Sequence, residues 1–405
     1  MDQTPLSDAK SRLAAEVDGR ADVLLDVSRR IHAQPELGYE EHFAHDLLTG
    51  VLKDAGLAVT RAARGVDTAF EARAGGIGPL VAVVCEYDAL PGIGHACGHN
   101  VIAAAGLGAG LAAAALAEEL GGQVLVVGTP AEEGGGGKVR LIDGGTFKGV
   151  DAALMVHPAD ADLTAMDVVA LQQAHVTYTG EAAHAAAFPH RGRNALDAAV
   201  LGYLNVAALR QHIAAGERLH GIITDGGDRP NIVPAYARTE WIVRSPTVAG
   251  LEVLKTRFLA CLEAGATAAG CEMDLEWIDP VYADMIDSQA IVERYRANAE
   301  ALGRIVRVPS PQARVVGSTD MGNVSYVVPS IHPMIRVAPP GVPIHTPAFA
   351  GFAGGPEGDA AVLDGAKALA FTVADLWLDG GLVERAQGEW REAVAGRSGA
   401  VAGGA

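Results

Sequence analysis

The stretch LVAVVCEYDALPGIGHACGHN, residues 80–100, joins an apolar run to a cluster of groups that can bind a metal. The run LVAVVCEY (80–87) is rich in valine and ends in polar residues, which is typical of a strand buried on both faces of a parallel sheet. Two later segments, QVLVVGTPAEE (123–133) and DAALMVH (151–157), repeat this form, and helical patterns separate them. The sequence therefore predicts an α/β fold with a mainly parallel sheet flanked by helices.

Polar side chains follow each of these apolar runs directly. Asp88 comes after the first run, Glu132 and Glu133 close the second, and His157 closes the third. In open α/β sheets the ligand crevice lies beyond the carboxyl ends of the strands. We therefore expect three separate segments to place chemistry at one edge of the sheet.

The pattern changes between residues 168 and 278. Alternating segments at 169–180, 221–227 and 237–244 indicate half-exposed strands, and 194–212 and 248–269 indicate helices. Two helices on a four-stranded antiparallel sheet would form an inserted α+β domain with its own core. The predicted organisation is a first segment at 1–167, the insert at 168–278 and a second segment at 279–405. Helices are expected at 11–32, 42–55, 288–302 and 358–378, and a strand at 327–335.

The overall composition and charge argue against several classes of function. The chain has 405 residues and a formal net charge of −18, which argues against a nucleic-acid or anionic-membrane surface. The apolar run at 103–116 is expected to be too short to cross a bilayer, and the N-terminal residues have the pattern of neither a signal peptide nor a membrane span. Four cysteines are few for this length, so we expect a reduced, cytoplasmic protein without a disulfide framework.

Cys97 and His99 are the first candidate metal ligands. A thiolate and an imidazole two residues apart can bind one transition metal ion or two adjacent ions. The pair alone is a weak signal, because a buried thiol beside a capping histidine has the same pattern. A zinc ribbon would need paired C-x-x-C motifs, which the chain does not contain.

The segment TPAEEGGGGK (129–138) is the second candidate. One glutamate could bind a metal while its neighbour moves a proton, and the glycines would allow close backbone approach. A phosphate-binding loop is the rival interpretation, but Glu132 and Val139 occupy positions where that pattern needs Gly and Ser or Thr. An exposed acidic turn is the remaining alternative.

With these motifs in order, the chain resembles the co-catalytic metallohydrolase family of aminoacylases, carboxypeptidase G, auxin-conjugate hydrolases and aminobenzoyl-glutamate hydrolase. It looks most similar to the cysteine-ligand branch that includes the β-alanyl-lysine type of dipeptidase. The resemblance covers nearly the full length of the chain. The further matching motifs are GEAAHAAAFPHRGRNALDA (180–198), RPNIVPAYARTEWIVR (229–244), GSTDMGNVSYVVPSIHP (317–333) and IHTPAF (344–349).

The resemblance implies a zinc-exopeptidase-like catalytic domain that holds two divalent metal ions. Zn²⁺ is favoured by the thiolate, and Mn²⁺ is the alternative. By this resemblance, the protein ligands of the two metal ions would be Cys97, His99, Glu133, His157 and His345. Glu132 would be the general base that activates the attacking water, and Asp88 would orient a ligand. The chain departs from the broader family at Glu86, where a histidine is usual.

The resemblance also assigns roles to the insert, which would serve as a dimerisation and lid domain. His184 would hold the substrate carbonyl and the oxyanion, in some relatives from the partner subunit. Asn231 and Arg244 would bind the carboxylate of the substrate.

The expected activity is hydrolysis of an amide bond in an N-acyl amino acid or a dipeptide by a homodimer. An aryl amide or aminobenzoyl-glutamate is the alternative substrate. Two other functional classes stay open. A hydrolase with Cys97 as nucleophile would leave Glu132 and Glu133 without a role, and a non-catalytic zinc-binding protein would tolerate Glu132→Gln.

Overall fold

The structure is a computed structural model that describes residues 4–309 and 316–402. It divides into two compact units. Unit 1 is formed by Met1–Asp167 and Met285–Ala395, and unit 2 by Val168–Asp284 and Gly396–Ala405. Each unit has its own hydrophobic core.

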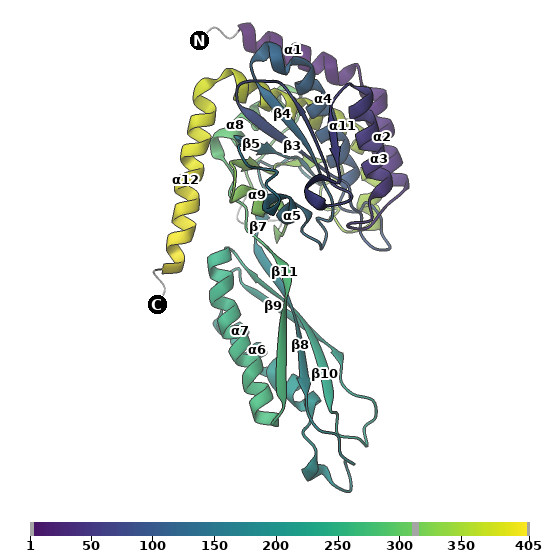
Figure 1. Cartoon of the computed structure of the whole chain (residues 1–405), viewed down its shortest axis with the longest axis vertical. Coiled ribbons are helices and arrows are strands. Elements are labelled where there is room, and N and C mark those ends of the chain that lie inside the picture. The colour runs from purple at the N-terminus through teal and green to yellow at the C-terminus, as the bar shows by residue number, and fades with distance from the viewer. Residues whose placement is uncertain (1–3, 310–315, 403–405) are drawn as a thin grey trace. The chain divides into compact units, whose positions relative to one another are not determined.

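Unit 1 is built on a six-stranded sheet (Figure 1). In sheet order its strands are β1 (Val59–Arg61), β2 (Phe70–Ala74), β4 (Gln123–Thr129), β3 (Leu80–Glu86), β5 (Ala152–Leu154) and β13 (Ser330–Ile331). The last four run parallel to one another, and β1 and β2 add an antiparallel edge. Every residue of β3 is buried, as the unbroken apolar run predicted. The predicted α/β class with a mainly parallel sheet is confirmed.

Helices flank this sheet. The helices described outside Val168–Asp284 are α1 (Thr4–Asp18), α2 (Ala21–Ala33), α3 (His42–Asp54), α4 (His99–Leu120), α5 (Gly137–Asp143), α8 (Gln289–Ala301), α9 (Met321–Ser325), α10 (Pro347–Ala353), α11 (Pro356–Leu378) and α12 (Gly380–Ala402), with a 3₁₀ turn at Ala63–Gly65. Helix α4 packs against α11 and against β3 and β4. The packing is close because a Cβ added at Gly110 would lie 2.3 Å from Val126 Cγ2. Glycine at this position therefore sets the approach of helix to sheet.

By length and composition alone, helix α4 is long and apolar enough to span a membrane. It extends beyond the apolar run at 103–116, which we expected to be too short to cross a bilayer. The tested window of the helix is 89% buried inside the protein. Its position is that of a core helix.

Two predicted elements of unit 1 are interrupted. The helix expected at 11–32 is two helices, α1 and α2, separated at Gly19 and Arg20, since glycine favours helix ends. The strand expected at 327–335 is β13 and β14 (Met334–Arg336), and Pro333, which has no N–H to donate, lies between them. Strand β14 pairs in parallel with β6 (His157–Ala159).

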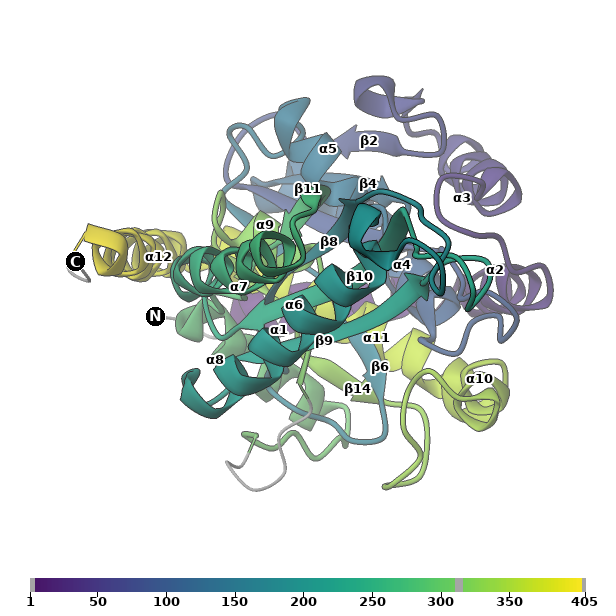
Figure 2. The ribbon, with the colours of Figure 1, turned by 90° about the horizontal axis from the view of Figure 1, so that it is seen from below.

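Unit 2 is a four-stranded antiparallel sheet with two helices on one face (Figure 2). In sheet order the strands are β11 (Glu272–Tyr282), β8 (Ala170–Thr179), β10 (Tyr236–Ser245) and β9 (Arg218–Asp225); the helices are α6 (Ala195–Leu209) and α7 (Val248–Ala269), with 3₁₀ turns at Pro189–Arg191 and Arg210–His212. Side chains of β10 alternate between the buried helix-facing side and the other face. The predicted α+β architecture of the insert is confirmed. Two short strands, β7 (Asp167–Val168) and β12 (Val316–Gly317), complete the elements.

Candidate metal centre

The expected metal ligands of unit 1 lie at the ends of strands and helices or in the loops beside them. Glu132 and Glu133 follow β4, His157 opens β6, and His99 is the first residue of α4. Gly98, between two of these ligands, has φ 81°, and a Cβ there would lie 2.8 Å from Pro158. Only glycine fits this conformation and this space, so the glycine of the CGH motif is required by the turn that presents both side chains.

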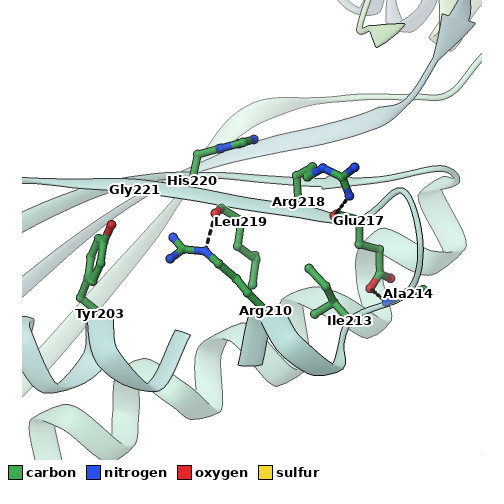
Figure 3. Close-up of a pocket in the computed structure, with 9 residues that line it drawn as sticks. All are labelled: Tyr203, Arg210, Ile213, Ala214, Glu217, Arg218, Leu219, His220 and Gly221. Atoms are coloured by element: carbon green, nitrogen blue, oxygen red, sulfur yellow. Dashed lines mark hydrogen bonds between the residues drawn. The ribbon is translucent and has the colours of Figure 1, made fainter. Parts of the chain in front are cut away.

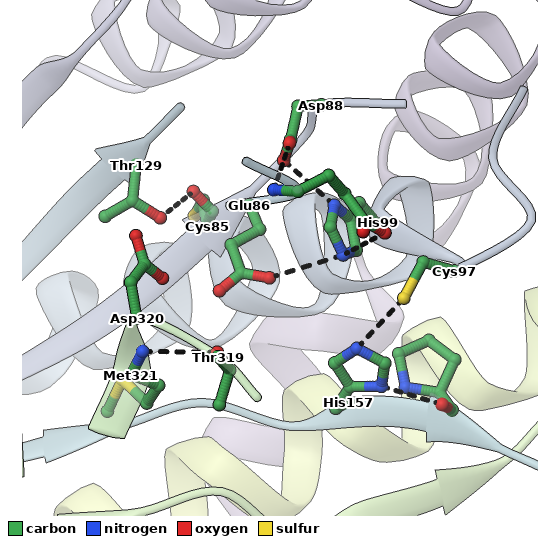
Figure 4. A network of polar contacts seen from close by, with 12 residues as sticks. Cys85, Glu86, Asp88, Cys97, His99, Thr129, His157, Thr319, Asp320 and Met321 are labelled. Atoms are coloured by element: carbon green, nitrogen blue, oxygen red, sulfur yellow. Dashed lines mark hydrogen bonds and ion pairs between the residues drawn. The ribbon is translucent and has the colours of Figure 1, made fainter. Parts of the chain in front are cut away.

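Donor atoms from six of these residues converge; Figure 4 shows three of them, Cys97, His99 and His157. In three groups all donor atoms lie within 4.8 Å of one another, and the groups are Cys97–His99–His157, Cys97–Glu133–His345 and His99–Glu132–Glu133. The first two groups share Cys97 and no other residue. The structure thus brings all five predicted ligands and Glu132 together, with Cys97 common to the first two groups and with His99 and Glu133 joined in the third.

Hydrogen bonds set the tautomers of two histidines. Nδ1 of His99 lies 2.9 Å from Asp88 Oδ1, and Nδ1 of His157 lies 2.8 Å from the carbonyl oxygen of Pro158. Each Nδ1 therefore donates its proton, so the neutral form of each ring has its lone pair on Nε2. Without metal, burial acts to lower the pKa of His99, but Cys97 and Asp88 raise it. His157 Nε2 lies 3.4 Å from Cys97 Sγ, and His99 Nε2 is buried without a hydrogen-bond partner among the described residues. Both rings present the nitrogen that a metal ion would bind.

Asp88 connects two of the predicted ligands. Its Oδ1 accepts from His99, and its Oδ2 accepts the backbone N–H of Glu133 at 2.9 Å. Burial acts to raise the pKa of Asp88, but the charge and hydrogen bond of His99 outweigh it and hold that pKa below its usual value. The orienting role expected for Asp88 is compatible with this geometry.

The turn that carries the two glutamates is held from another part of the chain. Ala131 has φ 56°, an unfavourable left-handed conformation for a residue with a Cβ. Its N–H donates to Glu41 Oε1 at 2.8 Å, and Thr68 Oγ1 donates to Glu41 Oε2 at 2.8 Å. Sequence reasoning missed Glu41. Its only signal is an acidic residue beside a helix start, which is common at such positions.

The pKa values of the two adjacent glutamates are shifted in opposite directions. Burial, together with the nearby charges of Glu86 and Glu133, raises the pKa of Glu132 well above its usual range. Burial also acts to raise the pKa of Glu133, but the hydrogen bond with His345 and the charge of His99 lower it. Neighbouring carboxyl groups with opposite pKa shifts are typical of a pair in which one moves a proton and the other binds.

His345 reaches the cluster from far along the chain. Its N–H donates to the carbonyl oxygen of Ala96 at 2.8 Å, and its φ of 64° is left-handed. The Nε2 atom lies 3.4 Å from Glu133 Oε1, and the side chain is 49% exposed. The cluster is therefore open to solvent on the side of His345.

Lys138 is a second residue that sequence reasoning missed, since it was considered only as part of a phosphate-loop pattern. Its side chain is fully buried and pairs with Asp320 at 2.6 Å and with Glu86. Burial would lower the pKa of Lys138, but the two carboxylates raise it, so the side chain is an ammonium ion. Burial raises the pKa of Asp320 to about 6, against the opposing effect of Lys138.

The three candidates in unit 2 do not form one group. His184 bridges to Ile232, and the N–H of Ala185 donates to the carbonyl oxygen of Asn231, so His184 and Asn231 are neighbours. Arg244 lies near the other end of β10, eight residues beyond Tyr236, which is about 26 Å of strand. Within a single unit 2, Arg244 therefore lies far from the other two residues.

His184 has a defined tautomer. Backbone N–H groups of Ala186 and Ala187 donate to its Nδ1 at 3.3 and 3.2 Å. The Nε2 atom of the neutral ring therefore carries the proton and can donate it to an oxygen.

A cavity of about 640 Å³ lies in unit 2, beside the edge strand β9 (Figure 3). Its lining residues are Tyr203, Arg210, Ile213, Ala214, Glu217, Arg218, Leu219, His220 and Gly221. None of the predicted site residues lines it, so the candidate metal centre rests on the donor cluster of unit 1.

The donor set fits two divalent cations. Thiol, imidazole and carboxyl groups are ligands of zinc and related metals. Six acidic groups belong to this cluster or border it, and Lys138 pairs with two of them, Glu86 and Asp320. The other four are Cys97, Asp88, Glu132 and Glu133. Buried anions are stable when paired with cations, and two divalent ions would balance most of this charge.

Comparisons with known proteins point the same way. A model of peptidase family M20/M25/M40 matches residues 82–370. The Xaa-Arg dipeptidase of Mus musculus is 40% identical over 403 residues, which cover 94% of this chain and 92% of the relative. One of the subunits of the p-aminobenzoyl-glutamate hydrolase of Escherichia coli is 30% identical over 440 residues, 91% of this chain and 92% of the relative.

A solved structure shares the fold. A dinuclear metal-binding peptidase of the M20 family from Bacillus subtilis aligns with a TM-score of 0.69 and 18% sequence identity, covering 88% of this chain and 98% of that one.

Proposed function

The chain belongs to peptidase family M20/M25/M40, and on that premise we propose that it is a dipeptidase for substrates with a basic C-terminal residue. As a member of this family it is a metallohydrolase that cleaves amide bonds. The 40% identity with an Xaa-Arg dipeptidase supports the substrate class. Aminobenzoyl-glutamate is the second candidate substrate, supported by the 30% identity with a subunit of its hydrolase.

The observation that carries the mechanism is the pair of donor groups that share Cys97. We propose that His99 and His157 hold one metal ion, that Glu133 and His345 hold the other, and that the thiolate of Cys97 belongs to both sites. When bound, such a pair polarises the scissile carbonyl and lowers the pKa of water. A thiolate with imidazoles favours zinc, and manganese is the alternative. As a ligand, Cys97 is not the nucleophile.

Glu132 is the proposed proton carrier. Its carboxylate accepts a proton from the attacking water and donates that proton to the leaving amine. Its raised pKa, caused by burial and by the charges of Glu86 and Glu133, makes its carboxylate a stronger base than that of an ordinary glutamate, which suits proton uptake from water. Asp88 keeps the lone pair of His99 on Nε2 during this cycle.

The residues of unit 2 are proposed to bind the substrate. His184 donates its Nε2 proton to the oxyanion, and Asn231 and Arg244 bind the free carboxylate of the substrate. The distance between Arg244 and the other two residues supports a dimer in which each active site draws on both subunits. Exposed apolar side chains on α6 and on the edge strand β9, such as Leu204 at 56% and Ile222 at 61%, support dimerisation through this unit.

The first test compares Glu132→Gln with a matched control, Glu118→Gln, at an exposed position in the last turns of α4. Both variants are loaded with Zn²⁺ or Mn²⁺ and assayed on Xaa-Arg and Xaa-Lys dipeptides, aminobenzoyl-glutamate and N-acyl amino acids. We expect Glu132→Gln to lose about 10²–10⁴-fold in kcat and to keep its metal content. Wild-type turnover by Glu132→Gln, or full activity of chelated protein, would overturn the mechanism.

A second test addresses the subunit arrangement. Leu204→Glu should shift the protein from dimer to monomer in analytical ultracentrifugation, while Ile77→Glu, at a 78% exposed position of unit 1, should not. Mixing the inactive variants Glu132→Gln and His184→Ala should restore about a quarter of wild-type activity if subunits exchange and His184 serves the partner's site. No recovery after verified exchange would assign His184 to its own subunit.

A further inference from the structure

Lys138 has the environment of a functional lysine. Its side chain has no exposed surface, and it lies at the start of α5, directly after four consecutive glycines. Lysine is almost never fully buried unless it is paired, because removing an ammonium ion from water is costly. Here Nζ lies 2.6 Å from Asp320 Oδ1 and forms a second ion pair with Glu86 Oε1. Two carboxylates therefore share one buried cation.

The three partners come from separate elements and hold one another in place. Glu86 is the last residue of β3, Lys138 lies in the first turn of α5, and Asp320 precedes α9. Asp320 binds Lys138 twice, since its Oδ2 also accepts the backbone N–H of Lys138 at 2.9 Å. The ammonium ion is therefore fixed in position, and so is the oxygen of Glu86 that pairs with it.

The other oxygen of Glu86 faces the metal ligands. Glu86 Oε2 lies 3.6 Å from Nε2 of His99, the nitrogen that presents its lone pair to the donor cluster (Figure 4). A carboxylate at this distance from a ligand atom is close enough to compete for the same cation, because carboxylates bind zinc and manganese well. Glu86 nevertheless directs one oxygen to the ammonium of Lys138.

We propose that Lys138 is a positioning residue of the metal centre, whose ammonium ion binds Glu86 and keeps that carboxylate from becoming a metal ligand. The inference rests on the proposed function for the presence of the metal pair. An added anionic ligand would reduce the positive charge that polarises the substrate carbonyl, and it would fill a coordination position that substrate or water needs. Lys138 thus keeps the centre open and electrophilic.

The test substitutes Lys138→Met, which keeps the length of the side chain and removes its charge. The proteins are loaded with Co²⁺, whose visible spectrum reports coordination number and thiolate ligation, and metal affinity is measured by competition with a chelator. We expect the released Glu86 to bind cobalt, so the absorption weakens as coordination number rises, and affinity increases. The expected fall in kcat is about 10–100-fold, with little change in KM.

A structural role would give a different result. If Lys138 only supported the fold, its loss would lower metal affinity and activity together. The matched control is Lys10→Met, because Lys10 also pairs with a buried carboxylate, Asp375 at 2.7 Å, in the same unit. Lys10→Met should lower stability and leave the cobalt spectrum unchanged. A Lys138→Met protein with wild-type spectrum and affinity would overturn the proposal.

Glu86→Gln keeps the proposal testable if Lys138→Met does not fold. This variant retains Lys138 with Asp320 and removes the carboxylate that is held back, so we expect wild-type metal affinity and cobalt spectrum. Weaker binding or a changed spectrum would make Glu86 a ligand in the wild-type protein and would overturn the inference. These readouts need no substrate. Failure of the wild-type protein to bind cobalt refutes the proposed function, whereas a Lys138→Met protein that binds cobalt with wild-type affinity and spectrum refutes only the role of Lys138.

Discussion

Replacing Glu41 with glutamine tests how the turn before the two active-site glutamates is held. Glu41 is fully buried, and its two oxygens accept from Ala131 and Thr68. Glutamine keeps the acceptor for Ala131, and the hydroxyl of Thr68 can rotate to accept from the new amide. The substitution therefore preserves shape and hydrogen bonding and removes only the ability to ionise.

The size of the effect follows from the pKa. Burial, helped by the negative charge of Asp88, raises the pKa of Glu41 from 4.5 to about 7. The folded protein therefore binds a proton between these pH values that the unfolded chain has released. Stability from this group is complete below about pH 4.5 and is lost as pH rises through about 7. The difference corresponds to about 3 kcal/mol.

The assay is urea unfolding of chelated wild-type and Glu41→Gln protein at a series of pH values, followed by circular dichroism. Groups common to both proteins cancel in the difference between their unfolding free energies. We expect that difference to change by about 3 kcal/mol across this range, with wild type losing stability relative to the variant as pH rises. A constant difference at all pH values, or a change of opposite sign, would refute the assigned environment of Glu41.

Two further predictions concern single contacts. Asp88→Asn presents an amide N–H₂ to one of its two donors, so it should weaken metal binding about 10–100-fold in a chelator competition; an unchanged affinity would show that His99 does not need this partner. Gly110→Ala should destabilise the protein by about 1–3 kcal/mol in urea unfolding, because its Cβ would contact Val126 at 2.3 Å. Gly50→Ala, in α3 with no atom within 4 Å of its Cβ, should stabilise by up to about 1 kcal/mol, and equal shifts for both variants would contradict the close approach of α4.

The sequence predicted the elements whose pattern is set by burial alone. Strand β3 is buried at every residue and was recognised as an apolar run, and α7 has the bounds that its pattern predicted. Elements divided by one residue were harder to predict. The break between α1 and α2 at Gly19 and the interruption at Pro333 depend on local geometry, which a hydrophobic period does not contain.

The residues of the candidate site, too, were predicted from the sequence only in part. The convergence of strand ends pointed to Glu132, Glu133 and His157, whereas the part of His345 came from family resemblance. Lys138 and Glu41 were missed because their partners, Asp320 and Ala131, are 182 and 90 residues away in the chain. A buried ion pair has no local pattern, since only the tertiary fold brings its members together. The individual roles of the site residues stay predictions until the variants are measured.

The insertion of unit 2 into unit 1 has a consequence for synthesis on the ribosome. His345 follows Cys97 by 248 residues, and translation at about 5–20 residues per second separates their appearance by roughly 12–50 s. During that interval α4 lacks its packing partner α11, and the thiol lacks a ligand of one proposed metal group. Most of unit 2, a nearly continuous stretch of chain, emerges in the meantime. The nascent chain therefore carries an incomplete, thiol-containing site throughout this interval, a period in which chaperones or premature metal capture would have their greatest effect.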